Sequence, residues 1–536
     1  MKISEVLETS EISGQGRRLT MKAADLPLYY NAVDILERNL PQRADKLAVY
    51  SDTREPMTFR EVSDEANRVG NALKKLDFRI GETVAMLSLD CPEWVSSFFG
   101  TFKVGGIAAG INTLLTPGEV DYILNDCRAR VMIVHEKLLP TFDQIRDRQE
   151  YVKHVVVIGQ PSRPGDIAFR DWIAGESTGL QAAKTHRDDF CSLNYSSGTT
   201  GEPKGVLHMH KDYPLTSQLW GVNVLGLRED DRTLAGAKLF FTFGLGGGLI
   251  FPWYAGASIV LFSGPPRIPT NMLEMVQRFK PTILYNAPTG FAATLAVENF
   301  TQKYDLSSLR LCVSAGESLP APIWYAWKEA TGLDIVDGIG STENFHIFLS
   351  NRPGDIRPGS SGKPFDGYEL KIVDDSGNEL PRGEVGNLLV KGETATPFYL
   401  HQYGKSQNTF LGEWLFTGDK YTIDEDGYYW HAGRSDDMLK VGGIWVSPVE
   451  VESTLISHHA VLECAVVGQA DAAELIKPKA YVILNPGYEP SDALANELTE
   501  HCKQKMAEYK RPRWIEFVTE LPKTATGKIQ RFKLRG

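Results

Sequence analysis

The stretch YSSGTTGEPKGVLHMH, residues 195–210, places four Ser and Thr hydroxyls, three glycines and one lysine within the eleven positions from Tyr195 to Gly205. CSLNY (191–195) and GVLHMH (205–210) flank it and are strand-like, so the polar segment is predicted to join two strands. Glycines let the backbone turn and present N–H groups, while hydroxyls and a lysine add donors and positive charge. The segment therefore predicts a cradle for phosphate oxygens, made by Ser196, Ser197, Gly198, Thr199, Thr200, Gly201 and Lys204.

This phosphate loop differs from the Walker P-loop of ATPases, in which Ser or Thr follows the lysine and a helix begins. Here Pro203 precedes the lysine and Gly205 follows it. Proline removes an N–H and biases Glu202 away from helix, and no hydroxyl follows the lysine to bind Mg²⁺. The spacing argues against a Walker ATPase, and a merely polar hairpin loop is the other alternative.

Strand-like and helix-like segments alternate over the first four hundred residues. KLAVYS (46–51) and ETVAMLSL (82–89) predict strands, whereas TFREVSDEANRVGNALKKL (58–76) and WVSSFFGTFKVGGIAAGI (94–111) predict helices. Such alternation predicts the α/β class, with stacked and mostly parallel sheets covered by helices.

The pattern changes at about residues 365–430, where short strands are separated by the turn sequences DDSG (374–377) and DEDG (424–427). This part is predicted to be a β-subdomain. A new series of strands and helices starts near Leu439. We therefore expect a large N-terminal domain over residues 1–435 and a small α+β C-terminal domain over residues 436–536.

Composition limits the class of protein. The 536 residues carry a formal charge of −11, which argues against a general nucleic-acid binder, although residues 501–536 hold ten Lys or Arg against three Glu. That basic end is either a solvated tail or a lid over a polyanion. Six widely spaced cysteines without a C-x-x-C pair indicate a reducing compartment. No signal peptide and no apolar run of about 18 residues is evident, so we expect a cytoplasmic protein without a membrane partner.

YSSGTTGEPKG resembles the phosphate-loop signature of the adenylate-forming superfamily, which contains acyl- and aryl-CoA ligases, luciferases and the adenylation domains of peptide synthetases. Its other motifs follow in order: SAGESLP (314–320), GIGSTE (338–343), FTGD (416–419), GRSDDMLKVGG (433–443) and PKTATGKIQR (522–531). KLFFTFGLGGG (238–248), GIGSTENFHIFLSN (338–351) and VGGIWVSPVEVE (441–452) are most similar to benzoate-type aryl-CoA ligases. The resemblance spans essentially the whole chain.

This resemblance implies an AMP-forming acid–thiol ligase that uses ATP, Mg²⁺ and coenzyme A. An aromatic carboxylate first reacts with ATP to give acyl-AMP and pyrophosphate, and the thiol of CoA then takes the acyl group. A carboxylic acid is already ionised at neutral pH, so the first step requires positioning and charge neutralisation rather than a general base.

The resemblance also implies the residues that bind ATP and AMP. Thr342 would contact the α-phosphate, Glu343 would bind Mg²⁺, and Asp419 would accept both ribose hydroxyls. Ile339 stands where relatives often carry a tyrosine stacked on adenine, which removes an aromatic contact. Besides the phosphate loop, the implied nucleotide-binding residues are Gly316, Glu317, Asp337, Gly338, Ile339, Thr342, Asp419 and Arg434.

The small domain is implied to be mobile. Lys528 would stabilise negative charge in the adenylation transition state and would then leave as this domain rotates about a hinge at Asp436. The segment after the hinge would line the CoA tunnel, where glycines leave room for a thin chain. A tight turn is the alternative for this segment, and no base for the thiol is evident. The implied tunnel residues are Lys440, Gly442, Gly443 and Trp445.

Aromatic-rich segments coincide with positions that form the acyl pocket in the superfamily. We expect a flat slot with His346 near the substrate carboxylate, so His346 joins Lys528, Thr342 and Glu343 as a catalytic candidate. Phe243 stands where some benzoate-type relatives carry tyrosine, and the absence of that hydroxyl could admit a substituted ring. Ordinary core packing is the alternative for each aromatic residue. The expected pocket residues are Phe243, Ala287, Ile339, Gly340 and His346.

Several substrates agree with this sequence: benzoate, 2-aminobenzoate, a hydroxy- or halobenzoate, and cyclohexanecarboxylate. A fatty acid, an amino acid or luciferin is a further alternative. An amino-acid domain usually presents an acidic residue to the amine, and none is obvious here; no carrier domain follows Gly536 and no peroxisomal tripeptide ends the chain. A nucleotide-binding regulator without catalysis is the alternative of another class. Monomer and homodimer both agree with the sequence.

Overall fold

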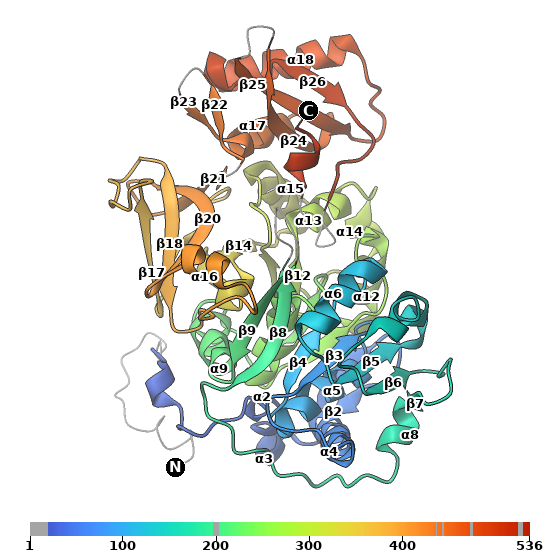
Figure 1. Ribbon diagram of the computed structural model, residues 1–536. Coiled ribbons are helices and arrows are strands. Elements are labelled where there is room, and N and C mark those ends of the chain that lie inside the picture. Colours follow the sequence, from blue (N-terminus) through green and yellow to red (C-terminus); the bar gives the residue numbers. More distant parts are fainter. Residues whose placement is uncertain are drawn as a thin grey trace, which may run out of the picture.

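The computed structural model describes residues 20–196, 203–435, 437–441, 444–471, 475–523 and 529–535. The predicted α/β class is confirmed: a large body of helices and mostly parallel sheets carries a smaller C-terminal unit, which lies above it in Figure 1.

A nine-stranded sheet forms one layer of the large body, in the order β16-β15-β14-β13-β12-β10-β11-β1-β2. The strands from β14 to β1 along this order run parallel, whereas β2, β15 and β16 pair antiparallel. Its strands are β1 (Leu47–Ser51), β2 (Met57–Thr58), β10 (Arg232–Ala235), β11 (Ser258–Leu261), β12 (Ile283–Asn286), β13 (Leu311–Ser314), β14 (Ile335–Gly340), β15 (Ile347–Ser350) and β16 (Lys363–Pro364).

A seven-stranded sheet forms a second layer, in the order β7-β6-β5-β3-β4-β8-β9. All its pairs are parallel except the last, which is the antiparallel β8–β9 hairpin. Its strands are β3 (Thr83–Leu87), β4 (Ile107–Gly110), β5 (Val131–His135), β6 (His154–Ile158), β7 (Ile167–Ala168), β8 (Phe190–Ser196) and β9 (Lys204–Met209).

Helices cover these sheets because their apolar faces need burial. Helix α4 (Phe59–Lys75) starts at a capping box in which Thr58 accepts from the Glu61 N–H while Glu61 accepts from the Thr58 N–H. The longer helices are α5 (Pro92–Lys103), α6 (Pro117–Asp126), α12 (Pro269–Phe279), α13 (Pro288–Leu295) and α15 (Ala321–Thr331). The shorter α-helices are α2 (Asp34–Glu37), α3 (Leu40–Arg43), α7 (Leu139–Phe142), α8 (Phe169–Ile173), α9 (Asp212–Thr216), α10 (Thr242–Leu245), α11 (Phe251–Tyr254), α14 (Phe300–Lys303) and α16 (Tyr403–Thr409).

Single turns and wide turns complete the helices. The 3₁₀ turns are η1 (Ala23–Asp25), η2 (Glu136–Leu138), η3 (Arg146–Arg148), η6 (Thr342–Asn344), η7 (Glu508–Lys510) and η8 (Arg531–Lys533). Two π-helical turns, η4 (Ser217–Val222) and η5 (Gly246–Ile250), extend α9 and α10.

The expected helix over residues 94–111 is wrong in its second half. Helix α5 ends at Lys103, and the chain then turns at Gly105, whose φ is +75°, before strand β4 begins at Ile107. A positive φ is unstrained only for glycine, so this residue stops the helix.

The predicted β-subdomain is a five-stranded antiparallel sheet in the order β17-β18-β20-β19, with β21 on β20. The C-terminal unit contains the hairpin β22–β23 and a three-stranded sheet packed on α17 (Pro448–Ile456) and α18 (Asp492–Lys505). The strands are β17 (Tyr368–Val373), β18 (Gly386–Gly392), β19 (Phe410–Leu411), β20 (Trp414–Ile423), β21 (Tyr429–Arg434), β22 (Leu439–Val441), β23 (Ile444–Val446), β24 (Val461–Ala470), β25 (Ile476–Leu484) and β26 (Trp514–Phe517). The domain boundary at residue 435 stays a prediction.

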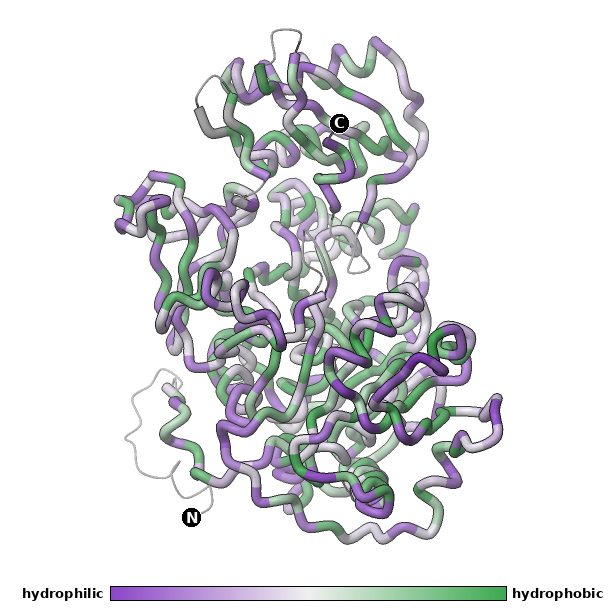
Figure 2. Tube along the Cα trace, viewed as in Figure 1, coloured by the Kyte–Doolittle hydropathy of each residue, from purple (hydrophilic) through white to green (hydrophobic). Residues whose placement is uncertain are grey.

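Apolar residues follow the inner strands of both units, whereas hydrophilic residues dominate the outer turns (Figure 2). The large core contains stacked aromatic pairs such as Phe99 and Trp253, whose ring centroids lie 5.4 Å apart. All six cysteines are free and buried. Within the described residues, no helix combines the length and the apolar character that crossing a bilayer requires.

Candidate functional site

The predicted site residues of the large body collect at one edge of the nine-stranded sheet. Strands β10, β12, β13 and β14 are neighbours and run parallel, so their carboxyl ends meet at the same edge. Ligands in open α/β sheets bind at this edge. The residues there are Phe243 in α10 beyond β10, Ala287 after β12, Gly316 and Glu317 after β13, Asp337, Gly338, Ile339 and Gly340 in β14, and Thr342 and Glu343 in η6.

The β8–β9 hairpin brings the described part of the phosphate loop to this edge. Ser196 and Lys204 are paired across the base of the hairpin. The predicted loop residues Ser197, Gly198, Thr199, Thr200 and Gly201 lie outside the described residues. The Lys204 Nζ lies 3.7 Å from the Glu343 Oε1 and 4.8 Å from the centroid of the Tyr399 ring. A cation from one sheet therefore meets a carboxylate that follows a strand of the other.

Glu343 is held as an anion. Its carboxylate accepts a hydrogen bond from the Tyr399 hydroxyl at 2.7 Å, and its side chain is only 13% exposed. Burial tends to raise the pKa of Glu343, but the Lys204 ammonium and the Tyr399 hydroxyl outweigh burial and hold that pKa below its usual value. The result is a buried, ionised carboxylate, the type of oxygen ligand that hard divalent cations prefer, next to a lysine that can bind phosphate oxygens.

Asp419 and Arg434 face each other across the antiparallel pair β20–β21. The Arg434 Nη1 donates to the Asp419 Oδ1 at 3.0 Å, and the His431 Nε2 lies 3.5 Å from the same oxygen. The Asp419 side chain is 12% exposed, whereas that of Arg434 is 43% exposed. The aspartate is thus fixed in place, while part of the guanidinium side chain is open to solvent.

Strand β14 contains a buried carboxyl, Asp337, and a glycine without room for a side chain, Gly340. Burial is the main reason that the pKa of Asp337 is raised to about 8. A Cβ on Gly340 would lie 2.5 Å from the carbonyl oxygen of His346, so only glycine fits where β14 passes that backbone. The close approach keeps His346 against the end of β14.

His346 lies in an aromatic enclosure together with Phe243. The His346 Nε2 donates to the Phe243 carbonyl at 3.3 Å, and the two ring centroids are 5.5 Å apart. Trp220 and Tyr285 border the same rings. Burial lowers the pKa of His346 to about 3, so the imidazole is neutral at working pH. Its buried Nδ1 has no hydrogen-bond partner among the described residues, and neither does the Tyr285 hydroxyl.

Of the six site residues predicted in the C-terminal unit, two are described, and only in their backbone. Asp436, Gly442, Gly443 and Lys528 lie outside it, and for Lys440 and Trp445 the backbone alone is described, paired within the β22–β23 hairpin. Lys523 and Ile529 form an antiparallel bridge on either side of residues 524–528. Two residues later, the Arg531 Nη2 donates to the buried Glu452 carboxylate at 2.8 and 2.9 Å. This ion pair joins Arg531, three positions after Lys528 in the sequence, to helix α17.

Sequence reasoning missed several residues of this site. Tyr399 belongs to none of the motifs, and its role is visible only from its contact with Glu343. Trp220 and Tyr285 were not distinguished from ordinary core aromatics, although Tyr285 lies in YNAPTGF (285–291), one of the aromatic-rich segments expected to form the acyl pocket. Two surface hollows that share Lys46, Glu229 and Asp230 contain none of the predicted site residues.

Comparison with protein-family models gives two matches. Residues 36–400 match the family described as AMP-binding enzyme, and residues 450–528 match the AMP-binding enzyme C-terminal domain. The chain is 46% identical to a benzoate–CoA ligase of Thauera aromatica, over 96% of this chain and 98% of the relative.

Solved structures give the same picture. The crystal structure of the anthranilate CoA ligase AuaEII in complex with anthranoyl-AMP superposes with a TM-score of 0.94 at 69% identity, covering 96% of this chain and 98% of that one. A benzoate CoA ligase from Burkholderia xenovorans LB400 superposes with a TM-score of 0.87 at 39% identity, covering 95% and 100% of the two chains.

Proposed function

This chain belongs to the AMP-binding enzyme family, and we propose that it is an ATP-dependent aryl-CoA ligase whose ring acid is 2-aminobenzoate. The observation that carries the proposal is the meeting of Lys204 and Glu343 at the strand ends, three residues before His346 and the aromatic rings around it. A cation and a carboxylate for the phosphates, with a cluster of aromatic rings at the same sheet edge, suit the two ends of an aryl-adenylate.

The first half-reaction joins two anions. A carboxylate oxygen of the ring acid bonds to the α-phosphorus of ATP, and pyrophosphate leaves with the electron pair of the broken P–O bond. Lys204 and the phosphate-loop donors would hold the phosphate oxygens, and Thr342 would contact the α-phosphate. Asp419 would accept the ribose hydroxyls, and Lys528 would approach the reacting phosphate from the small domain.

The residues fit a magnesium ion, because Glu343 is ionised and Mg²⁺ prefers carboxylate and phosphate oxygens. A bound Mg²⁺ neutralises charge on the phosphate oxygens. The chain's own contribution is to hold the Glu343 carboxylate in place through the Tyr399 hydroxyl.

In the second half-reaction, the sulfur of CoA bonds to the acyl carbon, AMP leaves, and the thiol proton passes to solvent. This step requires Lys528 to withdraw, which the proposed rotation about Asp436 would achieve. Lys440, Gly442, Gly443 and Trp445 are the proposed tunnel residues, and glycines suit the passage of a thin pantetheine chain.

The choice of 2-aminobenzoate rests on the enclosure as well as on the 69% identity to an anthranilate CoA ligase. A neutral imidazole whose Nδ1 is buried without a partner among the described residues can accept a hydrogen bond from an amino group on the ring. Phe243, Ile339 and Ala287 would supply apolar surface for the ring itself.

The test is a panel of acids assayed for AMP release with ATP and CoA: 2-aminobenzoate, benzoate, 4-hydroxybenzoate and cyclohexanecarboxylate. We expect the highest kcat/KM with 2-aminobenzoate and no activity without a carboxylate. Preference for benzoate would contradict the proposed substrate, and absence of carboxylate-dependent pyrophosphate exchange would contradict the enzyme.

A further inference from the structure

Thr342 and Glu343, two consecutive residues of the proposed nucleotide site, both contact side chains on one face of strand β9. Side chains two and four positions apart point to the same face of a strand, so Lys204 and His208 share a face. Lys204 lies beside the Glu343 carboxylate, and the His208 Nε2 lies 2.8 Å from the Thr342 carbonyl oxygen. That carbonyl belongs to the peptide group that joins Thr342 to Glu343.

Contacts of the His208 ring define where its protons lie. A carbonyl oxygen only accepts, so the Nε2 facing Thr342 carries a hydrogen. The Nδ1 lies 3.0 Å from the Asp212 Oδ2, which also accepts from the Met209 N–H. A second proton must therefore lie between His208 and Asp212, whichever of the two formally carries it. The pair is buried and has no net charge.

The neighbourhood of this pair is rigid. His208 packs edge-on against Phe345, at 5.2 Å between ring centroids, and Phe345 adopts a φ of +69° at the end of η6. A bulky residue in that region is strained and persists only where its surroundings fix it. Tyr213 also packs on the Phe345 ring, at 4.7 Å between ring centroids. The turn that carries Thr342 and Glu343 is thus clamped by β9 and α9.

We propose that His208 and Asp212 are positioning residues for adenylation: the doubly hydrogen-bonded imidazole fixes the Thr342–Glu343 peptide, and Asp212 keeps the hydrogen on the Nε2. This inference rests on the proposed function. In Asp212→Asn, the ring can donate its single hydrogen from Nδ1 to the oxygen of the introduced amide, which leaves the Thr342 carbonyl without a donor.

The experiment compares His208→Leu, His208→Gln, Asp212→Asn and the double variant His208→Gln/Asp212→Asn. Carboxylate-dependent pyrophosphate exchange reports adenylation, and CoA transfer from supplied acyl-adenylate reports the second half-reaction. We expect His208→Leu and Asp212→Asn to lower kcat/KM for MgATP in exchange by about 10- to 100-fold, the range seen when partners of metal ligands are removed. Transfer from the adenylate should change little.

A rescue experiment distinguishes a positioning role of His208 and Asp212 from a purely structural role. A glutamine amide at position 208 can donate to the Thr342 carbonyl without help from Asp212, so His208→Gln should retain exchange and Asp212→Asn should cost nothing further in that background. Asp188→Asn, at an exposed aspartate paired with Lys211, is the matched control. Equal loss in both half-reactions, or the same cost of Asp212→Asn in both backgrounds, would overturn the inference. Failure of exchange in the wild-type protein would instead overturn the proposed function.

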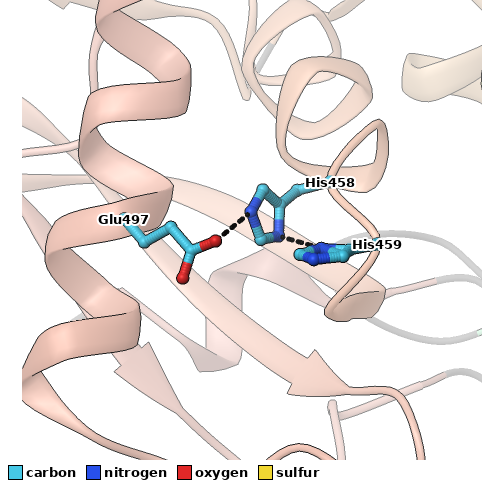
Figure 3. Close-up of side chains that lie close together, drawn as sticks. All are labelled: His458, His459 and Glu497. Atoms are coloured by element: carbon cyan, nitrogen blue, oxygen red, sulfur yellow. Dashed lines mark hydrogen bonds and ion pairs between the residues drawn. The ribbon is translucent and has the colours of Figure 1, made fainter.

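The C-terminal unit contains a cluster of three potential metal ligands. His458 and His459 follow helix α17; Glu497 on α18 faces the His458 ring, and His459 lies on the other side of that ring (Figure 3). The His458 Nε2 lies 3.2 Å from the Glu497 Oε1, and the two histidine Nδ1 atoms lie 3.3 Å apart. One ligand atom from each residue lies within 4.8 Å of the other two. His458 is buried, whereas His459 and Glu497 are exposed.

The geometry points to a transition-metal site formed by His458, His459 and Glu497, which a Zn²⁺-class ion would occupy. Two imidazoles and a carboxylate are a zinc donor set. The His458 Nε2, which faces Glu497, is the nitrogen that would bind, because the His458 Nδ1 accepts from the Ala460 N–H. A metal would replace the His458–Glu497 hydrogen bond and turn the exposed His459 ring toward it. His501, one helical turn beyond Glu497, packs against His458 at 5.0 Å.

Cobalt tests this site without an activity assay, because tetrahedral Co²⁺ has strong visible absorption. We expect one Co²⁺ per chain, displaced by Zn²⁺ but not by Mg²⁺. Binding should persist in Glu343→Gln, which alters the nucleotide site, and in Glu500→Gln, an exposed neighbour on α18. His459→Ala and Glu497→Gln, both at exposed positions, should abolish it. Unchanged binding in those two variants, or no tetrahedral spectrum in the wild-type protein, would overturn the assignment.

Discussion

The Lys204 ammonium and the Glu343 carboxylate lie 3.7 Å apart although they come from different sheets: Lys204 starts β9 in the seven-stranded sheet, and Glu343 follows β14 in the nine-stranded one. Each sheet thus contributes one charge to the proposed phosphate site. Their separation depends on how the two layers pack, and not on any local motif.

Glu343→Gln should abolish the proposed magnesium ligand while keeping the shape of the side chain. We expect adenylation to fall by about 10²–10³-fold, as when a charge-stabilising group is removed from an active site. Pyrophosphate exchange measured against Mg²⁺ concentration checks this. Glu369→Gln, at an exposed residue paired with Lys391, is the control and should behave as wild type.

Lys528→Ala should separate the two half-reactions. In the proposed mechanism its charge acts only when the carboxylate attacks ATP, so we expect exchange to fall by about 10²–10³-fold while CoA transfer from supplied acyl-adenylate is retained. Lys533→Ala removes an equal charge from the exposed end of the same basic segment. Equal losses in both half-reactions would remove Lys528 from its proposed role.

The Arg531–Glu452 ion pair lies three positions after Lys528 in the sequence, and we expect it to help position the end of the basic segment. Burial raises the pKa of Glu452, and Arg531 opposes this effect. Arg531→Gln would leave a buried carboxylate unpaired, which costs about 3–5 kcal/mol, and should lower both the melting temperature and the rate of adenylation. Arg531→Met/Glu452→Gln should recover much of the melting temperature, because it removes both charges and keeps an acceptor for the Val466 N–H. A single variant as stable as the wild type would contradict this role.

His346→Leu should change substrate preference more than overall activity. Loss of the Nδ1 acceptor removes a hydrogen bond that only the amino-substituted ring can make, so kcat/KM should fall about tenfold more for 2-aminobenzoate than for benzoate. Phe243→Leu, which removes apolar surface alone, should lower both values alike. An equal effect of His346→Leu on the two acids would exclude His346 from recognition of the amine.

Much of this arrangement could be predicted from local sequence. The segments that flank the phosphate loop alternate in polarity and so predict two strands, and β8 and β9 confirm that placement. The helix expected over 94–111 is wrong in its second half because an apolar run does not distinguish a buried helix from a buried strand. The turn at Gly105 is what separates α5 from β4.

The missed residues depend on contacts that are distant in sequence. Tyr399 lies 56 positions from Glu343, and His208 lies 134 positions from Thr342. Neither a tyrosine in a loop nor a histidine in an apolar strand carries a local mark of such a partner. The His208 contact arises only when the β8–β9 hairpin packs against the strand ends of the other sheet, and the Tyr399 contact only when the loop after β18 lies against that hairpin.

Burial of the Asp337 carboxyl makes the stability of the folded protein depend on pH, and it also sets the sign of that dependence. In the unfolded chain this carboxyl has its ordinary pKa near 3.8, whereas burial raises the folded value to about 8. The folded state therefore binds the proton more tightly, and its stability falls as pH rises from about 4 to about 8. Asp337→Asn removes this proton equilibrium. The melting temperatures of the variant and the wild type are measured without nucleotide. The difference, variant minus wild type, should increase from about pH 4 to about pH 8 and level off above that pH. Asp334→Asn is the control. A difference independent of pH would contradict the buried, protonated carboxyl.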